Sequence, residues 1–372
     1  MRPLQSRVNR RDLLRLRRAG RALARPEIDA NADAPGAQDL LRAQRAAMGS
    51  YFEVRLGART PGGVELAERA LDLIDTLEAQ LTVYRDDSEL SRLNATAHLG
   101  PVVVEPGLFG LLDHAVRLGA ATDGAYDVAT GALSEAWGFF RGPKRVPAPE
   151  TLEDARARTG AHHLRLDPER MTVAFDRSGI VINLGSIGKG CAIDRVVDLV
   201  RAHWWPTSAL VHGGRSSLYA LGSPPGRFGD RWEVALHNPF DSESPLGLIR
   251  IRNRGMGTSG ASFQRFESGG RVFGHILDPR TGAPADGPAS VTVLAPTAAE
   301  ADALSTAFYL LGRAGTLPYL ENHPEIAAIF VEESRAGESP RITTFGLDRD
   351  EFERLPAGRS RRTQPTEFTR HV

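Results

Sequence analysis

The sequence has little cysteine, no long apolar run and no excess of charge of either sign. Cys191 is the one cysteine among 372 residues, so the chain cannot form an internal disulfide, a cysteine-based zinc site or an iron–sulfur cluster. Lysine plus arginine and aspartate plus glutamate both number 46, so net charge favours neither nucleic acid nor an acidic partner. No stretch reaches the roughly 18–20 apolar residues that a membrane-spanning helix needs.

The first 45 residues are rich in arginine and alanine. Asn9 to Leu14 resembles a twin-arginine export signal, but arginines between Arg15 and Arg25 interrupt the apolar run of roughly 7–15 residues that such a signal requires. No lipobox is present either, which on residues alone favours a cytoplasmic protein with a basic, flexible tail over residues 1–45. The same reasoning predicts a folded domain over residues 46–346 and a second polar tail over residues 347–372.

Hydrophobic periodicity predicts both helices and strands inside the folded region. Helical spacing marks residues 64–81, 106–121, 189–203 and 298–311. Strand patterns mark residues 50–56, 163–166, 171–175, 179–184, 209–211, 232–236, 247–251, 271–276, 289–294 and 326–332. Because the strands outnumber the helices and do not alternate strictly with them, the pattern predicts an α+β fold with a mainly antiparallel sheet.

Four segments combine glycine with small polar residues. The first runs from Thr122 to Gly131 and carries Asp123 and Asp127 around a Gly-Ala turn. The two aspartates are interpreted either as capping residues or as part of a turn that offers backbone groups to a flat heterocycle. The residue types alone favour capping.

The second segment runs from Ile182 to Gly190 and has the pattern of a strand that ends in a glycine-rich turn and opens a helix. In that geometry, backbone N–H groups and the helix dipole hold phosphate. The segment is not a Walker A loop, because Asn183 stands where that motif needs glycine, and Gly190 follows Lys189 where it needs serine or threonine. A P-loop enzyme is therefore disfavoured, and phosphate binding in a different register stays open.

The third segment has two parts, residues 257–260 and a later stretch from Gly274 to Gly282. The later stretch contains Asp-Pro-Arg-Thr-Gly, a turn signature whose ordinary role is to close a hairpin. His275 stands on the strand just before this turn. A single histidine is more often structural, but one beside a glycine-rich turn is a candidate acid or base, because its unperturbed pKa is ~6.5.

The fourth segment, Ala299 to Thr306, follows a predicted strand and begins a predicted helix. Asp302 and Thr306 are four residues apart and therefore share one helical face. A carboxylate and a hydroxyl are hard oxygen ligands that suit Mg²⁺, which takes few protein ligands. Taken alone, the pair more often marks the beginning of a helix than a metal site.

In their common order, these segments resemble the FAD:protein FMN transferase family, also called the ApbE family. The most specific stretches are Asp87-Ser88-Glu89-Leu90-Ser91-Arg92-Leu93-Asn94 and His275 to Gly282, and further matches are Met48-Gly49-Ser50, Trp137-Gly138-Phe139, Gly213-Gly214 and Thr258-Ser259-Gly260. The resemblance covers residues 48–312 and more loosely reaches residue 346. It implies an α+β fold with a T-fold-like core.

The resemblance also implies an activity and a site. Family members move FMN from FAD onto a threonine or serine hydroxyl of an acceptor protein, release AMP and depend on Mg²⁺. It implies that His275 activates the acceptor hydroxyl and that Ser186, Asp302 and Thr306 hold the metal ion. The residues expected to contact FAD are Met48, Tyr84, Ala125, Tyr126, Asp127, Asn183, Lys189 and Ile276. Family members are commonly extracytoplasmic, which the N-terminal segment of this chain does not support.

Three positions depart from the family's common residues. Asn183 and Arg215 stand where aspartate is common, and Cys191 replaces a frequent tyrosine. These departures bear on substrate preference more than on fold. Two alternative functions stay open on sequence alone: a Mg²⁺-dependent FAD pyrophosphatase that yields FMN and AMP, and a flavin-binding protein without catalysis.

Overall fold

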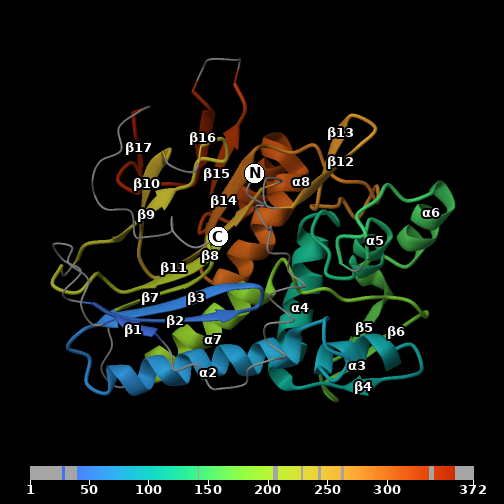
Figure 1. Ribbon diagram of the computed structural model, residues 1–372, viewed down its shortest axis with the longest axis horizontal. Helices are drawn as coiled ribbons and strands as arrows, with labels where there is room; N and C mark the ends of the chain where they lie inside the picture. The colour runs from blue at the N-terminus through green and yellow to red at the C-terminus, as the bar shows by residue number, and fades with distance from the viewer. Residues whose placement is uncertain are drawn as a thin grey trace, which may run out of the picture.

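A nine-stranded antiparallel sheet forms the centre of the protein (Figure 1). The computed structural model describes residues 27–29, 40–140, 142–203, 208–227, 229–241, 244–260, 264–334 and 339–356. In sheet order the strands are β1 (Glu27–Asp29), β2 (Leu40–Ala47), β3 (Ser50–Gly57), β7 (Ala209–Gly213), β8 (Ser217–Leu221), β11 (Arg254–Ser259), β14 (Ser290–Ala295), β15 (Ala327–Glu332) and β16 (Arg341–Phe345).

Helices cover one face of this sheet, and a small second sheet covers the other. The helices are α2 (Gly63–Leu81), α7 (Gly188–Ala202) and α8 (Ala298–Asn322), which share the main apolar cluster with inward strand residues such as Phe52 and Val293. The second sheet contains β9 (Trp232–Leu236), β10 (Gly247–Ile251) and β17 (Phe352–Arg354), and its side chains pack with Leu218 and Ile329. Because successive side chains of a strand point to opposite faces of the sheet, the strands contribute to an apolar core on each face.

The remaining elements gather at one side of the molecule (Figure 1). They are α3 (Glu89–Thr96), β4 (Val102–Val103), α4 (Pro106–Ala121), α5 (Gly131–Ala136), α6 (Pro149–Ala157), η2 (Ala161–His163), β5 (Leu164–Asp167) and β6 (Thr172–Phe175). A hairpin of β12 (Arg265–Ser268) and β13 (Arg271–Gly274) projects beside them. No helix of the described segments has the length and apolar content that crossing a bilayer requires.

The predicted α+β class with a mainly antiparallel sheet is confirmed. The four predicted helices are present, and the predicted end of the last one falls just before Gly312, whose φ of 63° interrupts α8. The predicted strand over residues 179–184 is wrong. Its backbone instead pairs with a side chain, because Ile182 N–H donates to Asn94 Oδ1 and Asn94 Nδ2 donates to the Ile182 carbonyl.

Both predicted domain limits need correction. The tail predicted over residues 1–45 is wrong for Glu27–Asp29 and for residues 40–45, because β1 pairs with β2 and β2 pairs with β3 along its full length. The tail predicted over residues 347–372 is wrong for β17, which pairs with β10. β1 and β17 have three residues each, too few for a periodic apolar signal, and Arg42, Gln44 and Arg45 interrupt the apolar residues of β2. Residues 1–26, 30–39 and 357–372 lie outside the described part of the chain.

Glycines allow α7 and α8 to pack closely against each other and against the sheet. A Cβ atom at Gly190 of α7 would overlap the backbone of Ala298 at the start of α8. A Cβ atom at Gly257 of β11 would overlap the backbone of Ala301. The beginning of α8 can therefore approach both elements at backbone distance only because these positions have no side chain.

We expect Gly190→Ala to destabilise the protein, because the added methyl group must push α7 and α8 apart. Overpacking of this kind costs about 1–3 kcal/mol or more in the free energy of unfolding, which urea denaturation measures. Gly110→Ala is the matched control, since Gly110 is an exposed helical glycine in α4 with open space around its Cβ position. It should stabilise the protein by about 0.5–1 kcal/mol. Equal effects of the two substitutions would contradict the packing argument.

Candidate functional site

The carboxylate of Asp302 is buried where α7, α8 and β8 meet. Its Oδ2 accepts a hydrogen bond from Gly190 N–H at 2.8 Å, and its Oδ1 accepts one from Ser217 Oγ at 2.6 Å. Burial raises the pKa of Asp302, against the opposing effects of the Lys189 charge and these two hydrogen bonds. Burial of an acid lowers the stability of its ionised form, and acids with pKa values shifted in this way are concentrated at functional sites.

Hydroxyl groups line the helical face next to Asp302. Thr306 Oγ1 lies 3.5 Å from the Asp302 carbonyl oxygen, as expected for residues four apart on a helix. Ser259 Oγ, at the end of β11, lies 2.8 Å from Ser305 Oγ and 3.1 Å from Thr306 Oγ1. The structure therefore brings Asp302 and Thr306 together as the sequence predicted, and adds two serine hydroxyls beside them.

Tyr126 lies within electrostatic range of this acid and close to Ser186, and each of the two comes from a different part of the chain. Burial raises the pKa of the Tyr126 hydroxyl, and the charge of Asp302 raises it further, while nearby Ser186 lowers it. Within the described residues, however, the Tyr126 hydroxyl satisfies the distance and angle of no hydrogen bond, although its side chain is only 1% exposed. Proximity without that geometry does not satisfy a buried polar atom. The hydroxyl is thus available for a group that enters the site.

The chemistry of the predicted metal ligands suits a small, hard cation. They are the Asp302 carboxylate, which has unused lone pairs, and the hydroxyls of Ser186 and Thr306, and all of them offer oxygen. In the described part of the chain, no three His, Cys, Asp or Glu residues cluster as a metal site. A cation here would therefore keep several waters or contact a substrate, which is the preference of Mg²⁺ rather than of Zn²⁺.

The glycine-rich turn opens α7, as the sequence predicted. Asn183 Oδ1 accepts a hydrogen bond from Gly185 N–H at 2.9 Å, so the amide side chain holds the turn itself. Asn183 N–H donates to the Val128 carbonyl at 2.8 Å, which ties this turn to the Thr122–Gly131 segment. Lys189 lies in the first turn of α7, and its charge acts on Asp302. The two predicted glycine-rich segments are therefore neighbours in space.

The carboxylate of Asp127 has a structural role. Its Oδ1 accepts from Ala129 N–H and its Oδ2 from Ala161 N–H, both at 2.7 Å. Ala125 and Tyr126 are buried, so this turn offers backbone rather than an exposed surface. The capping interpretation thus describes the Asp127 side chain, and the turn that it holds also contains Tyr126.

His275 follows β13 and is held by a backbone carbonyl. Its Nδ1 lies 3.2 Å from the Gln264 carbonyl oxygen, and its N–H donates to the same oxygen at 3.1 Å. A carbonyl oxygen can only accept, so Nδ1 carries the proton in the neutral ring and Nε2 is the nitrogen able to take one. The ring also packs edge-on against Phe139, with 6.5 Å between centroids.

The other predicted flavin contacts come from three separate loops. Met48 occupies the tight turn between β2 and β3 with a φ of 49°, and it packs against the main apolar cluster that also contains Ile276. Tyr84 is 46% exposed and lies 5.4 Å from Phe140 between ring centroids. Among these residues, Tyr84 presents the accessible aromatic ring.

Sequence reasoning missed three residues that organise the site. Ser217 donates to Asp302, Asn94 clamps the chain before the glycine-rich turn, and Asp194 accepts hydrogen bonds from Ala298 N–H and Ala299 N–H at the start of α8. Burial raises the pKa of Asp194 to about 7, against the lowering effect of these two amides. Asn94 ends one of the two most specific stretches of the family resemblance, and Asp194 lies within the residues 48–312 that it covers, which was the available signal for their importance.

Arg215, one of the three departures, stands at the exposed β7–β8 turn. Its charge lowers the pKa of nearby His237 in addition to the effect of burial. The turn is two residues from Ser217, so the changed charge lies close to the Asp302 site without being part of its hydrogen bonds.

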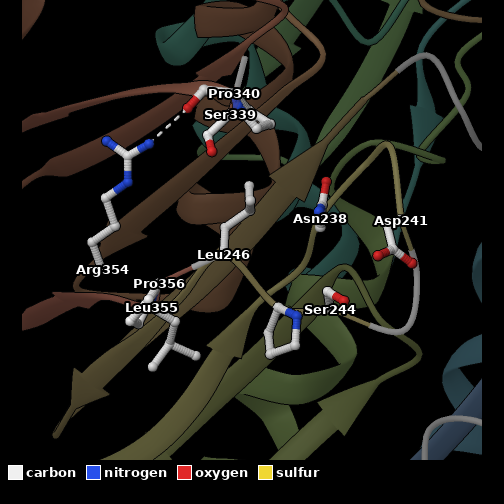
Figure 2. A pocket seen from close by; sticks show the side chains of 10 residues that line it. Asn238, Asp241, Ser244, Leu246, Ser339, Pro340, Arg354, Leu355 and Pro356 are labelled. Carbon is white, nitrogen blue, oxygen red and sulfur yellow. Dashed lines mark hydrogen bonds between the residues drawn. The ribbon is translucent and has the colours of Figure 1, made fainter. Parts of the chain in front are cut away.

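A separate hollow of about 490 Å³ lies at the second sheet (Figure 2). It is lined by Asn238, Asp241, Ser244, Pro245, Leu246, Ser339, Pro340, Arg354, Leu355 and Pro356. Arg354 closes one wall by donating to the Pro340 carbonyl at 3.0 Å. None of the predicted site residues borders this hollow, so it is distinct from the Asp302 site.

Comparison with known proteins identifies relatives along most of the chain. The model of the ApbE family matches residues 48–330. A Treponema pallidum (strain Nichols) protein named FAD:protein FMN transferase is 32% identical over 302 residues, which cover 76% of this chain and 82% of that protein. A Salmonella typhimurium (strain LT2) protein of the same name is 31% identical over 272 residues, which cover 71% and 77%.

Solved structures with the same arrangement agree with this match. The ApbE protein of Thermotoga maritima has a TM-score of 0.72 and 27% identity, and the match covers 81% of this chain and 96% of that one. Apo flavinyl transferase ApbE of Pseudomonas stutzeri has a TM-score of 0.71 and 29% identity, with coverage of 87% and 96%.

In the absence of metal, we expect Asp302→Asn to raise the free energy of unfolding and Asp302→Ala to lower it. Asparagine can still accept from Gly190 N–H and donate to Ser217, whereas alanine leaves both buried donors unsatisfied at a cost of about 1–3 kcal/mol each. Urea unfolding in EDTA should therefore show a loss for Asp302→Ala only.

The pH dependence provides the check. The pKa of Asp302 is higher in the folded protein than in the unfolded chain. Deprotonation of Asp302 therefore lowers the free energy of unfolding of the wild type at pH values above the unfolded-state pKa, and it has no effect at lower pH. The stability advantage of Asp302→Asn should thus be absent in acid and grow as pH rises. An advantage that shrinks with rising pH would contradict the assigned environment.

Proposed function

Because this chain belongs to the ApbE family and is an FAD:protein FMN transferase, we propose that it attaches FMN to a threonine or serine hydroxyl of its acceptor protein, releases AMP and requires Mg²⁺. The region that matches the family contains every predicted site residue, from Met48 to Thr306. The buried acid Asp302, with its oxygen donors beside a glycine-rich turn, is the observation that carries the proposal.

The proposed reaction is a phosphoryl transfer with His275 as the base. The acceptor hydroxyl oxygen forms a bond to the FMN phosphorus, and the bridging P–O bond of the FAD diphosphate breaks to release AMP. The hydroxyl proton passes to Nε2 of His275, which the Nδ1 contact with Gln264 leaves as the proton-accepting nitrogen. The hydrogen bond to the carbonyl also fixes the ring orientation.

The diphosphate would lie at the beginning of α7. The Lys189 ammonium supplies positive charge there, and the dipole of α7 adds to it. Mg²⁺ held by Ser186, Asp302 and Thr306 would neutralise phosphate charge. The Tyr126 hydroxyl would gain the hydrogen-bond partner that it lacks among the described residues.

The isoalloxazine ring would occupy a slot bordered by Met48, Tyr84 and Ile276. Tyr84 offers an exposed aromatic face for stacking, whereas the Tyr126 ring is buried and can form only the wall behind it. FAD would therefore be bound by aromatic stacking at its isoalloxazine ring and by charge neutralisation at its diphosphate.

The decisive experiment incubates the protein with FAD, Mg²⁺ and a candidate acceptor protein, followed by mass spectrometry of the acceptor. A mass gain equal to bound FMN, together with stoichiometric AMP, supports the proposal. AMP released from FAD without any acceptor would instead establish a pyrophosphatase. Bound FAD with no AMP under either condition would establish a flavin-binding protein without catalysis.

His275→Ala should retain FAD binding and lose transfer by about 10²–10⁴-fold, the usual contribution of a general base. Flavin fluorescence measures the binding, and the initial rate of acceptor flavinylation measures the transfer. His98→Ala is the control, because His98 is exposed in a loop after α3. A His275→Ala rate equal to that of the control would remove this residue from the mechanism.

Asp302→Asn should fold, bind FAD weakly and lose most transfer activity in Mg²⁺. The substitution removes the charge that holds the cation and preserves the hydrogen bonds. Transfer rates measured across a series of EDTA-buffered Mg²⁺ concentrations should show that the wild type saturates and the variant does not. A wild-type response of the variant to Mg²⁺ would place the metal elsewhere.

A further inference from the structure

Three hydroxyl groups, those of Ser259, Ser305 and Thr306, form a hydroxyl network beside the buried acid Asp302. Ser259 Oγ lies 2.8 Å from Ser305 Oγ and 3.1 Å from Thr306 Oγ1. At its other end, the network reaches the Asp302 carbonyl oxygen through Ser305 Oγ at 2.8 Å. A hydroxyl has one proton to donate and two lone pairs that accept, whereas a carbonyl oxygen only accepts. The carbonyl therefore fixes the direction of each hydrogen bond in turn.

The Asp302 carbonyl oxygen receives the proton of Ser305. One of its two lone pairs takes the amide of the residue four positions later, Thr306, as in any α-helix. The second faces Ser305 Oγ at 2.8 Å, the normal distance of an O–H···O hydrogen bond. Two oxygen atoms repel each other at this distance unless a proton lies between them. Ser305 thus donates its only proton to the carbonyl.

The other two hydrogen bonds of the network follow from this first one. Ser305 Oγ has no proton left, so it accepts the proton of Ser259. Ser259 has then used its own proton, and its contact with Thr306 Oγ1 is a hydrogen bond only if Thr306 donates. The Asp302 carbonyl does not compete for that proton, because it lies 3.5 Å from Thr306 Oγ1 and its lone pairs are already used.

This direction leaves the Thr306 oxygen ready to bind a cation. A hydroxyl binds a cation through a lone pair, so its proton has to point elsewhere. The proton of Thr306 points to Ser259, and among the described residues no donor is bonded to Thr306 Oγ1. Both of its lone pairs are therefore available on the helical face that it shares with Asp302.

Packing fixes the position of the Ser259 hydroxyl. Ser259 ends β11 and lies opposite Val291 of β14 in the central sheet. Side chains alternate along a strand, so Ser259 and Gly257 are on the same face, toward α8. A Cβ atom at Gly257 would overlap the backbone of Ala301, so the missing side chain lets α8 lie against this strand. The sheet thus holds Ser259 within hydrogen-bond distance of two consecutive residues of α8.

We propose that Ser259 is a positioning residue of the metal site, which accepts the proton of Thr306 and so directs the lone pairs of Thr306 Oγ1 to the cation. This inference rests on the proposed function, in which Thr306 helps to hold Mg²⁺. Ser259 acts through Thr306 and contacts neither the ion nor FAD. Residues that orient a metal ligand by a hydrogen bond typically contribute about 10–100-fold to metal affinity.

The test measures the binding of Mg²⁺ to the FAD-loaded protein by equilibrium dialysis, without acceptor protein. We expect Ser259→Ala to raise the Kd for Mg²⁺ by about tenfold or more, because Thr306 loses the acceptor of its proton. Ser259→Thr retains the hydroxyl and should return the Kd to within about threefold of wild type. A wild-type Kd for Ser259→Ala, or a Ser259→Thr variant as weak as Ser259→Ala, would overturn the proposal.

Thr258→Val is the matched control, because it removes the preceding hydroxyl of the same strand. Thr258 points to the opposite face of the sheet, where its Oγ1 lies 2.9 Å from Oγ1 of the buried Thr292. Its loss should lower the free energy of unfolding in EDTA, since the Thr292 hydroxyl loses its partner. The Kd for Mg²⁺ should stay within about twofold of wild type. A rise equal to that of Ser259→Ala would assign both effects to strand stability and overturn the proposal.

Ser305→Ala tests the direction of the protons. Without Ser305 Oγ, Ser259 is free to donate to Thr306 and to occupy one of its lone pairs, so the Kd for Mg²⁺ should rise here too. An unchanged Kd would contradict the assigned direction. A wild type that binds FAD but no Mg²⁺ would refute the metal dependence of the proposed function and this role with it. A wild type that binds Mg²⁺ as tightly as all of these variants would refute the role of Ser259 alone.

Discussion

The hydrogen bond from Gly190 N–H to Asp302 is the interaction on which the arrangement of the site depends. It requires α7 and α8 to approach at backbone distance, which is possible only because Gly190 and Gly257 have no side chains. The same approach buries a carboxylate at the beginning of α7, next to Lys189. Burial of an acid is unfavourable in an isolated fold, and it becomes favourable when a bound cation contributes the missing positive charge.

The residues of the proposed site come from three parts of the molecule, and the proposed function gives each part a different task. The helix pair α7 and α8 carries Asp302, Thr306 and the glycine-rich turn proposed to bind phosphate. The elements between α3 and β6 supply Tyr126 and fix it through the Asp127 turn. The β12–β13 hairpin supplies His275 with its tautomer defined by Gln264. In the proposed function, charge neutralisation, flavin contact and proton transfer thus belong to structural units that are separate in sequence.

Sequence periodicity predicted the elements whose stability comes from an amphipathic face. Helices α2 and α4 fit this description, and their predicted bounds agree closely with the structure. Strand β11 was missed because it contains Gly255 and Gly257, which disfavour a strand locally but let α8 pack against the sheet. The segment around Ile182 was mistaken for a strand because its extended backbone bonds to the Asn94 side chain. In both cases a distant contact outweighed local propensity.

The order of the motifs was sufficient to indicate the family, the fold class and the types of residue that the chemistry needs, because these follow from residue identity and local pattern. Asp302 and Thr306 were likewise readable as a pair, since helical spacing alone places them on one face. The roles of Ser217 and Asp194, and the unsatisfied hydroxyl of Tyr126, were decided by tertiary structure. The hydrogen bonds of Ser217 and Asp194 join residues 85 to 105 positions apart. They depend on how closely the backbones pack, and no local pattern encodes that distance.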